Sequence, residues 1–405
     1  MSRFQRAPGD PERQRATTLE LFYDLVFVFA VTQVSHLLLN HLDWAGVGQS
    51  ALVLMVVWWS WNYTTWVTNE LDPESVVVRL MLIAVMLASL LMAVAIPEAF
   101  GDRALLFAGA YVAIQCGRHA FLAFAAHERG TPERERAERI LFWFAIAGVF
   151  WIAGALVEEG TPRTILWLIG LTIDWTAPLH LYWLPGKGRG ASAAWEVQTS
   201  HFAERFQLFV IIALGESIVL TGAPTSELEL TSERLLAFAV AFLTTAAMWW
   251  LYFNYVATIA ERRLELSPER TKLARDGYTY LHVVLIAGVI VSAVGDELTI
   301  AHPGEVLPGK EVAISVAGPA IYLLGHALFR WRLTGSPGWK RPGGALACVV
   351  VGLVFGGWAS ALVVATLTLA VLVAVIAAEY LSGRRRAARG EPTPLEALDG
   401  QSLPS

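Results

Sequence analysis

Apolar runs of about 20 residues recur along the whole chain, and they limit most strongly what it can fold into. A run of this length is what an α-helix needs to cross the hydrocarbon core of a bilayer. The composition agrees, because 55% of the 405 residues are hydrophobic and only 16% are charged. That balance is too apolar for a soluble protein of this length. We therefore predict an all-α polytopic integral membrane protein.

The apolar runs predict about twelve transmembrane helices. We expect the first six over residues 19–40, 46–68, 75–96, 102–126, 138–157 and 163–184, and the second six over residues 199–221, 233–257, 277–297, 311–333, 343–359 and 361–381. The last two spans belong to one continuous apolar run, 343–381, so the sequence does not decide between a single helix and a tight hairpin of two helices. A cytoplasmic tail is expected at 1–16, a Gly-rich cytoplasmic linker at 185–198, and a polar, Pro-containing, disordered tail at 383–405.

The positions of Arg and Lys predict the orientation of these helices. With the N-terminus inside, the inside segments hold 23 of these residues and the outside loops hold 4. Cytoplasmic loops of membrane proteins carry such an excess of positive charge. We therefore expect a protein of the cell (cytoplasmic or inner) membrane with both termini cytoplasmic. The same topology accounts for the basic loops, so they indicate no nucleic-acid partner.

Four landmarks occur in the same order in the two halves of the chain. Glu20 and Phe22 align with Glu204 and Phe206. Trp58-Trp59 and the following Asn62 match Trp249-Trp250 and the following Asn254. Ala93-Val94 matches Ala293-Val294, and Gly117-Arg118-His119 matches Gly325-His326. Six spans per half bring both halves in from the same side, so we predict two parallel six-helix repeats, 17–184 and 199–382. Their axis would place equivalent polar residues around a shared central region.

Carboxylates inside the apolar runs are the main functional candidates, because they are costly in a membrane. Glu20 and Asp24 lie one turn apart at the start of the first helix, where they are candidates for a functional site. The alternative interpretation is that they only cap the helix N-terminus, where the helix dipole favours anions. Glu216, deep in the seventh span, is interpreted either as a proton-carrying or cation-binding group or as a protonated carboxyl bonded across helices. Asp174 lies near the middle of the sixth span, and Pro178 frees its carbonyl.

Other polar side chains in the spans form a second group of candidates. Ser217 and Gln33, which align between the halves, accompany the carboxylates as transport-site candidates. Asn62 and Asn254 recur beside a Trp pair, which favours a pore or site over ordinary interhelical hydrogen bonds. Arg79 and Arg118 can extend toward the cytoplasmic surface, unless they pair with Asp24, Glu20 or Glu204. Carbonyls can satisfy three histidines within the spans, His119, His282 and His326. The other polar-network candidates lie toward the cytoplasmic end of the seventh span: His201, Glu204 and Arg205.

Several kinds of chemistry find no support in the sequence. No lysine lies in a span core, so a retinal Schiff base is excluded, and the two cysteines imply no disulfide framework. His127-Glu128 lacks the second His of a zinc protease motif, and no Gly-x-Ser-x-Gly or Walker loop is present. Bis-His haem ligation stays open, although nothing selects a pair. We expect no catalytic site, metal or cofactor.

Two long segments resemble the hallmark segments of the bacterial low temperature requirement A (LtrA) family. They are LELFYDLVFVFAVTQVSHLL in the first span and HFAERFQLFVIIALGESIV in the seventh, and the resemblance extends over essentially all spans. It implies a polytopic bacterial membrane protein linked to growth in the cold. The matching positions are Glu20, Phe22, Asp24 and Gln33 in the first segment and His201, Glu204, Arg205, Gly215, Glu216 and Ser217 in the second.

A fainter similarity links Phe22-Tyr23-Asp24 to the Phe-Ser-Asp motif of endolysosomal potassium channels, which also have two six-span repeats. The Ser is replaced by Tyr23, and Leu208 stands where the second repeat would need Asp. Potassium selectivity therefore does not carry over.

The leading hypothesis is a membrane transporter or permease, proton-coupled or proton-gated, for an ion or small solute. Asp24, Asp174 and Glu216 would titrate or contact the cation, and Glu20, Glu204 and Arg205 would form an ion-pair network at the cytoplasmic mouth. The alternatives are a cation channel built on the pseudo-twofold repeat and a non-transport, lipid-handling intramembrane enzyme or scaffold. The expected partners are the bilayer and the transported solute, and a homo-oligomer stays open.

Overall fold

We describe a computed structural model of the chain, covering residues 15–190, 197–227, 229–254 and 256–401. Over these residues the structure is helical apart from loops and isolated β-bridges such as that between Leu184 and Gly188. Nine of the described helices are long and apolar enough to cross a membrane. The prediction of an all-α, multi-pass membrane protein in contact with the bilayer is confirmed at this level.

The chain folds into two compact units. The first holds the residues up to Leu37 and Gly48–Phe202, and the second holds Leu38–Val47 and the residues from Ala203 onward. The parallel arrangement of two six-helix repeats, 17–184 and 199–382, stays a prediction. Residues 1–14 of the expected N-terminal tail and residues 191–196 of the expected linker lie outside the described residues.

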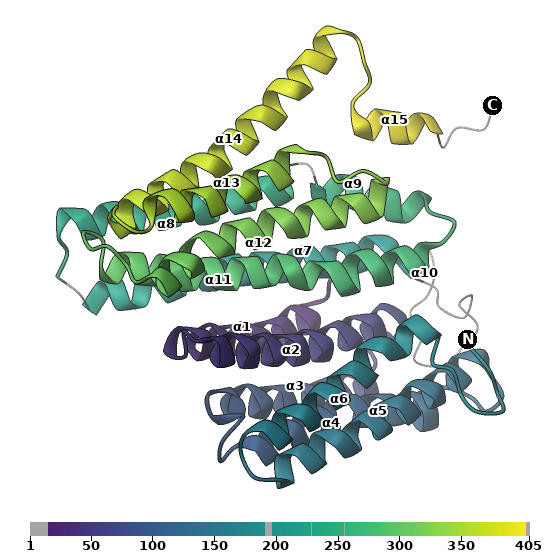
Figure 1. Cartoon of the computed structure of the whole chain (residues 1–405). Coiled ribbons are helices and arrows are strands. Elements are labelled where there is room, and N and C mark those ends of the chain that lie inside the picture. The colour runs from purple at the N-terminus through teal and green to yellow at the C-terminus, as the bar shows by residue number, and fades with distance from the viewer. Residues whose placement is uncertain (1–14, 191–196, 228, 255, 402–405) are drawn as a thin grey trace. The chain divides into compact units, whose positions relative to one another are not determined.

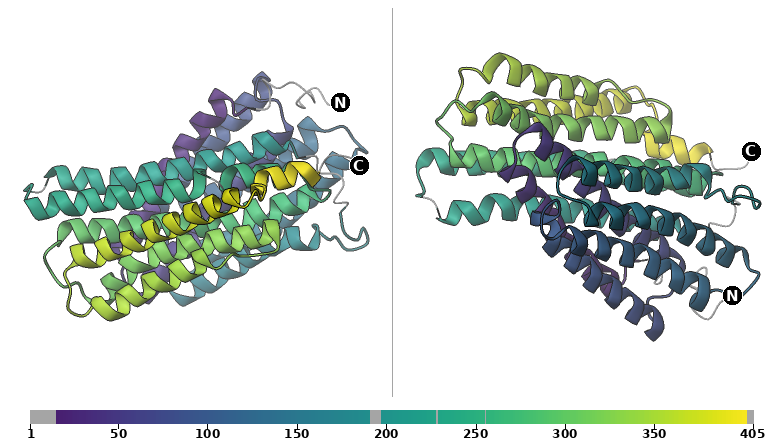
Figure 2. Two further views of the ribbon diagram at one scale, coloured as in Figure 1. Left: turned by 90° about the horizontal axis from the view of Figure 1, so that it is seen from above. Right: turned by 60° about the horizontal axis from the view of Figure 1, so that its bottom comes forward.

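The helices of the first unit pack mainly against their neighbours in the sequence, α3 on α4, α4 on α5 and α5 on α6. Figures 1 and 2 show these helices in purple to blue-green. They are α1 (Thr18–Asn40), α2 (Trp44–Glu70), α3 (Val76–Ala95), η2 (Ile96–Glu98), α4 (Ala104–Phe121), the π-helical turn η3 (Leu122–Ala126), α5 (Pro132–Leu156), α6 (Thr161–Thr176) and η4 (Ala177–His180).

Two tryptophans and two glycines fit the α5–α6 pair together. A Cβ on Gly154 would lie 2.5 Å from the Trp167 ring, and a Cβ on Gly170 would lie 2.9 Å from the Trp151 ring. The Trp167 Nε1–H also donates to the Trp151 carbonyl at 3.0 Å. Because each ring lies over a position without a side chain, Trp151 is fixed where it can reach a buried carboxylate of α6.

The helices of the second unit pack most closely at α11 and α12. The elements are α7 (Thr199–Glu227), whose residues up to Phe202 belong to the first unit, α8 (Ser232–Phe253), α9 (Val256–Leu266), α10 (Arg270–Leu273), the π-helix η6 (Ala274–Leu281), α11 (His282–Ala301), α12 (Gly309–Thr334), α13 (Lys340–Phe355), α14 (Ala361–Ala388) and α15 (Pro394–Gln401).

Four glycines explain how closely α11 and α12 approach. A Cβ on Gly288 would lie 2.5 Å from the Tyr322 backbone nitrogen, and a Cβ on Gly318 would lie 2.3 Å from that of Ser292. Gly295 and Gly325 continue the pattern, each seven residues along its own helix. Small residues at such spacing let helix backbones meet, which is the usual way helices associate in lipid.

Each of the twelve expected spans overlaps a helix, but three of these helices are not among the nine long and apolar ones: α2, α6 and α13. Helices α6 and α13 have only 16 residues each, fewer than the roughly 20 needed to cross the hydrocarbon core. The long apolar run 343–381 is a hairpin, since α13 ends at Phe355 and α14 begins at Ala361.

The C-terminal segment differs from the prediction. The residues after Arg384 were expected to be disordered, yet α14 continues through Ala388 and α15 follows. The segment between Ala378 and Ala388 is rich in Ala and Arg, which favour helix even where nothing apolar is buried. An ion pair between Arg262 of α9 and Asp399 of α15, at 2.7 Å, joins the last helix to its unit.

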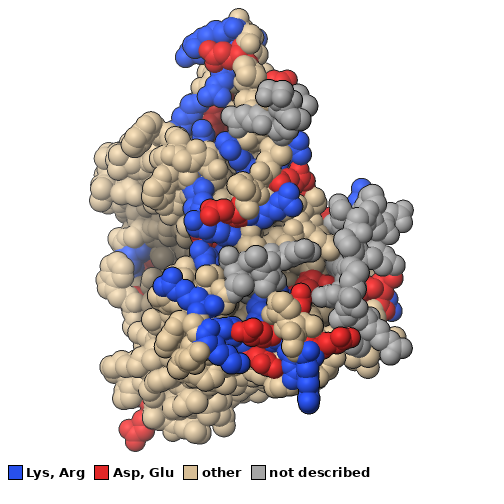
Figure 3. All heavy atoms as spheres, turned by 90° about the vertical axis from the view of Figure 1, so that its right-hand side faces the viewer, with Lys and Arg blue, Asp and Glu red and all other residues tan. Residues whose placement is uncertain are grey.

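Charged side chains gather at helix ends. Figure 3 views such an end, where Lys and Arg are mixed with Asp and Glu while the flanks are largely uncharged. Uncharged flanks are typical of helices that face lipid. The cytoplasmic location of both termini stays a prediction.

Candidate functional site

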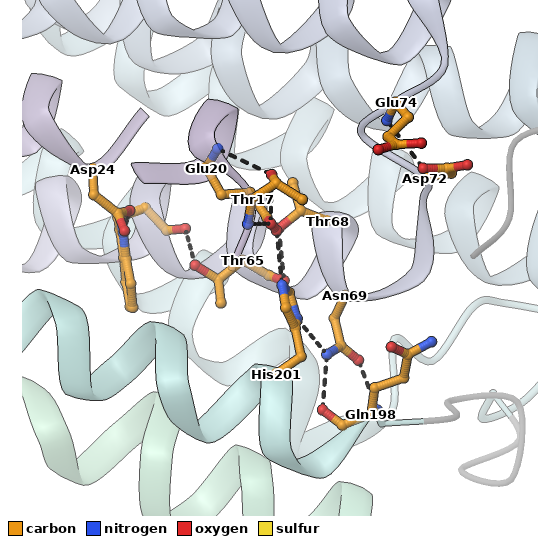
Figure 4. Close-up of polar contacts among 11 residues, drawn as sticks. Thr17, Glu20, Asp24, Thr65, Thr68, Asn69, Asp72, Glu74, Gln198 and His201 are labelled. Carbon is orange, nitrogen blue, oxygen red and sulfur yellow. Dashed lines mark hydrogen bonds and ion pairs between the residues drawn. The ribbon is translucent and has the colours of Figure 1, made fainter. Parts of the chain in front are cut away.

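The start of α1 carries a buried polar cluster within the first unit (Figure 4). Thr17 precedes the helix, and Glu20 lies in its first turn. The Glu20 Oε2 atom accepts hydrogen bonds from the Thr17 backbone N–H and from its hydroxyl, both at 2.9 Å. The same hydroxyl accepts a bond from the Glu20 N–H at 3.4 Å. This reciprocal pair is a capping box, which satisfies amides at a helix N-terminus.

The other oxygen of the Glu20 carboxylate reaches His201 at the start of α7. Its Oε1 atom lies 3.0 Å from His201 Nε2, and both side chains are fully buried. Asn69, near the end of α2, lies 3.1 Å from the other ring nitrogen of His201 and exchanges two hydrogen bonds with the Gln198 backbone. Glu20 and His201, both predicted candidates, therefore meet, and their contacts hold the ends of three helices together.

Asp24 lies one turn further along α1 and is fully buried. Its Oδ1 atom accepts a hydrogen bond of 2.8 Å from the Trp61 Nε1–H on α2. The neighbouring Trp58 and Trp59 are buried as well. The sequence singled out Asp24 and the Trp pair but missed Trp61 as a partner, because no pattern in either helix fixes their relative rotation.

Asp174 lies near the end of α6 and is only 2% exposed. Its Oδ2 atom accepts hydrogen bonds from the Tyr111 hydroxyl at 2.7 Å and from the Trp151 Nε1–H at 3.0 Å. Its Oδ1 atom has no partner among the described residues, and no described Lys, Arg or His forms an ion pair with it. Asp174 is therefore a buried carboxyl group in which Oδ2 accepts from two neutral donors and Oδ1 accepts from none of the described residues.

Pro178 breaks α6 after Asp174, as the sequence predicted. The α-helix ends at Thr176, a short 3-10 turn contains Pro178, and Leu181 and Tyr182 then adopt positive φ values of 51° and 48°. Left-handed backbone costs about 1–2 kcal/mol per non-glycine residue. A contact between the hydroxyls of Tyr182 and Tyr63 holds this turn against α2.

Arg118 is almost fully buried in α4, at 1% exposure, so the expectation that it extends to the membrane surface is wrong. Its Nη1 atom donates to the Thr64 hydroxyl at 2.7 Å and to the Ser60 carbonyl at 3.3 Å, and its Nη2 atom donates to Gln115 Oε1. Its CZ atom lies 5.7 Å from the centre of the Tyr63 ring. Thr64 and Gln115 were not predicted, although Gln115 precedes Arg118 by one helical turn.

Arg79, another predicted arginine, has a different environment. Arg79 is exposed at the start of α3, where its Nε–H donates to the Pro73 carbonyl at 3.0 Å. The prediction that it lies near a helix end is consistent with this position. Neither Arg79 nor Arg118 forms an ion pair with any described carboxylate.

In the second unit, Glu216 is buried in α7 at 4% exposure. The neighbouring Ser217 hydroxyl donates to the Leu214 carbonyl at 2.7 Å and lies 3.1 Å from the Thr245 hydroxyl of α8. Earlier in α7, Arg205 is fully buried and Glu204 is half-buried. The ion-pair network expected of these two with Glu20 stays a prediction.

The histidines differ in their partners. His119 Nδ1 lies 3.0 Å from the Gln115 carbonyl, and His282 lies 3.4 Å from the Gly277 carbonyl and 2.9 Å from the Tyr252 hydroxyl. The expectation that carbonyls satisfy these rings holds for both. It is wrong for His326, whose nitrogens have no hydrogen-bond partner among the described residues and whose ring packs on Tyr322.

The two repeated asparagines do not share an environment. Asn62 is fully buried in α2, whereas Asn254 is exposed just after α8. The tryptophans beside them differ in the same way, since Trp249 and Trp250 are 47% and 48% exposed. The prediction that both asparagines line one path is therefore not supported for Asn254. Gln33 is half-buried in α1.

Comparison with known proteins identifies the family. The model of the family described as bacterial low temperature requirement A protein (LtrA) matches residues 15–377. The chain belongs to the LtrA family. An uncharacterized protein of Rhizobium meliloti (strain 1021) is 38% identical over 316 residues, which are 78% of this chain and 76% of that protein. No solved structure matches the chain.

The LtrA match spans every buried group described above. It includes the capping box at Thr17, the carboxylates of Asp24, Asp174 and Glu216, and Arg118. Among the described residues, no group of three or more His, Cys, Asp and Glu side chains could hold a metal ion.

Proposed function

We propose that this LtrA family protein is a transporter or permease for an ion or small solute, that it is coupled to protons, and that Asp174 carries the proton. The observation that carries the proposal is the asymmetric carboxyl group of Asp174. Tyr111 and Trp151 donate to Oδ2, while Oδ1 has no partner among the described residues. A proton held on Oδ1 removes the charge without breaking either hydrogen bond. Losing it leaves an ionised carboxylate at a place where such groups mark proton relays.

Asp24 and Glu216 support the same proposal. Each is a buried acid in the middle or first half of an apolar helix, and the contact of Asp24 with Trp61 is to a neutral donor. Glu20 has a different role, since both of its oxygens serve the start of α1 and the link to His201. We place the transport groups at Asp174, Asp24 and Glu216 and assign Glu20 to positioning.

The test uses proteoliposomes loaded with a pH-sensitive dye, to which ions and small solutes are added one at a time. At least one solute is expected to change the internal pH through the wild-type protein. Asp174→Asn should abolish that change, because the amide still accepts from Tyr111 and Trp151 but cannot exchange a proton. Asp72→Asn is the matched control in the same unit, since the Asp72 side chain lies in a loop and, among the described residues, accepts a hydrogen bond from the Glu74 N–H alone. Proton movement that survives in Asp174→Asn would refute the role of Asp174.

A second measurement needs no substrate. Infrared difference spectra recorded between acid and neutral pH detect the C=O stretch of a buried carboxylic acid. We expect a band from Asp174 in the wild-type protein and in Asp72→Asn, and the loss of that band in Asp174→Asn, whether or not Asp24 and Glu216 add bands of their own. Identical spectra for all three proteins would contradict the proposal.

A further inference from the structure

Arg118 carries a positive charge that no described carboxylate neutralises. It lies eight residues before the end of the span Ala104–Ala126, which corresponds to a depth of roughly 12 Å along the helix. Its guanidinium contacts a carbonyl, a hydroxyl and an amide oxygen, all of which are neutral. Within the described part of the chain, no Asp or Glu oxygen lies within the 4.0 Å that defines an ion pair with it. A buried guanidinium stays charged at any physiological pH, and a buried charge is costly unless it is paired or otherwise compensated.

Three other buried arginines have their charges compensated. Arg139 pairs with Glu135 at 2.7 Å, and Arg341 pairs with Glu379 through two bonds of 2.8 and 3.0 Å. Arg163 has no carboxylate, but it donates to four backbone carbonyls, two of which belong to the C-terminal turn of α5 and its cap. The negative end of a helix dipole stabilises a cation there. Arg118 has neither kind of compensation.

Two buried donors beside this charge are unused. The Nε–H of Arg118 has no hydrogen-bond partner among the described residues. The Gln115 Nε2 amide lies beside the Tyr111 hydroxyl, which can take one of its two N–H groups and leaves the other without an acceptor there. The two side chains are in direct contact, because Arg118 Nη2 donates to the Gln115 oxygen. Buried donors are almost always satisfied in folded proteins. A charge without a counter-charge and two donors without acceptors therefore occur at one place.

We propose that Arg118 and Gln115 form a binding site for a small monovalent anion such as chloride. One guanidinium supplies one positive charge, which sets the charge of the ligand. The Tyr63 ring covers the guanidinium carbon at 5.7 Å, and Thr64 and Ser60 occupy Nη1, so the free side is limited to Nε and the Gln115 amide. A polyvalent anion would leave net negative charge in a helix bundle. The site does not require Asp174 to carry a proton, and it goes beyond the proposed transport function.

The test measures anion binding by thermal stability and involves no transport. The full chain in lipid nanodiscs is melted in sodium chloride, bromide, nitrate or gluconate at one ionic strength. A ligand that binds only the folded state raises the melting temperature. Chloride, bromide and nitrate should each raise the melting temperature above that in gluconate by at least about 2 °C at saturation.

Variants assign the effect to Arg118. Arg118→Gln should remove the dependence on the anion. Arg163→Gln is the matched control, because it removes another buried guanidinium of the same unit whose donors are already used, and it should keep the dependence. If Arg118→Gln does not fold, Gln115→Leu retains the charge and should weaken chloride binding by about tenfold, since a hydrogen bond to a charged group is lost.

Two results would overturn the proposal. One is a wild-type melting temperature that is the same in all four salts. The other is an anion dependence in Arg118→Gln or Gln115→Leu that equals that of the wild type.

Discussion

Replacing Gly318 by Ala should destabilise the second unit strongly, although the change adds a single methyl group. The added Cβ would lie 2.3 Å from the Ser292 nitrogen and 2.4 Å from its Cα. Contacts between such atoms normally measure about 3.5 Å or more. Because the obstructing atoms are backbone, no side-chain rotation relieves the clash. Helices α11 and α12 must therefore move apart by about 1 Å along a contact that the other three glycines keep close.

The cost of this overpacking is about 1–3 kcal/mol. It is opposed by the helix propensity of Ala, which exceeds that of Gly by roughly 0.5–1 kcal/mol. Gly383→Ala in α14 is the matched control, since nothing lies within 4 Å of its added Cβ. It gains the propensity term and incurs no clash. The free energies of unfolding of the two variants should therefore differ by about 2 kcal/mol.

The assay is unfolding by SDS in mixed micelles, followed by far-ultraviolet circular dichroism. Wild type, Gly318→Ala and Gly383→Ala are compared at one protein concentration. If Gly318→Ala is as stable as Gly383→Ala, the close approach of α11 and α12 is not as described and the reasoning fails.

Two further predictions concern the first unit. Thr17→Val removes both hydroxyl bonds of the capping box and should lower the free energy of unfolding by about 1 kcal/mol. The neighbouring Thr18 is exposed, so Thr18→Val is the control and should change stability little. Equal losses of stability in the two variants, measured by the same SDS assay, would argue against the capping box. Burial lowers the pKa of His127 below its ordinary value of 6.5, and Glu70, 3.3 Å away, opposes this shift only in part. The folded protein therefore binds fewer protons than the unfolded chain just below that pH, so stability is lost as the pH falls through about 6.5. His127→Gln should flatten the melting temperature between about pH 5 and 7, and an unchanged pH profile would contradict this.

Much of the fold follows from local sequence. Apolar runs predicted where the helices lie, because burying a backbone in lipid requires helix at each of them. The acid at Glu20, three residues after Thr17, carries the pattern of a capped helix start. The broken backbone at Pro178 was likewise readable, since proline removes a donor from the helix.

The partners of the buried groups were not readable in the same way. Trp61 bonds Asp24 and Trp151 bonds Asp174 because of how the helices rotate about their axes, which packing decides. The repeat suggested one environment for Asn62 and Asn254, yet one is buried and the other exposed. Similar residues at aligned positions do not fix burial, because burial depends on the helices that pack around each position. The helix after Arg384 was missed because polarity was taken as disorder.

The bond between Glu20 and His201 has a consequence for how the chain is made. Its partners lie 181 residues apart, and at 5–20 residues per second the ribosome needs roughly 10–40 s to synthesise that stretch. During this time the first helix is already in the membrane with a carboxylate that lacks His201. Thr17 precedes Glu20 in the chain, so the capping box can bind one oxygen of Glu20 before His201 has been synthesised. The second oxygen of Glu20 gains its partner only when α7 has been made and His201 can bond to it.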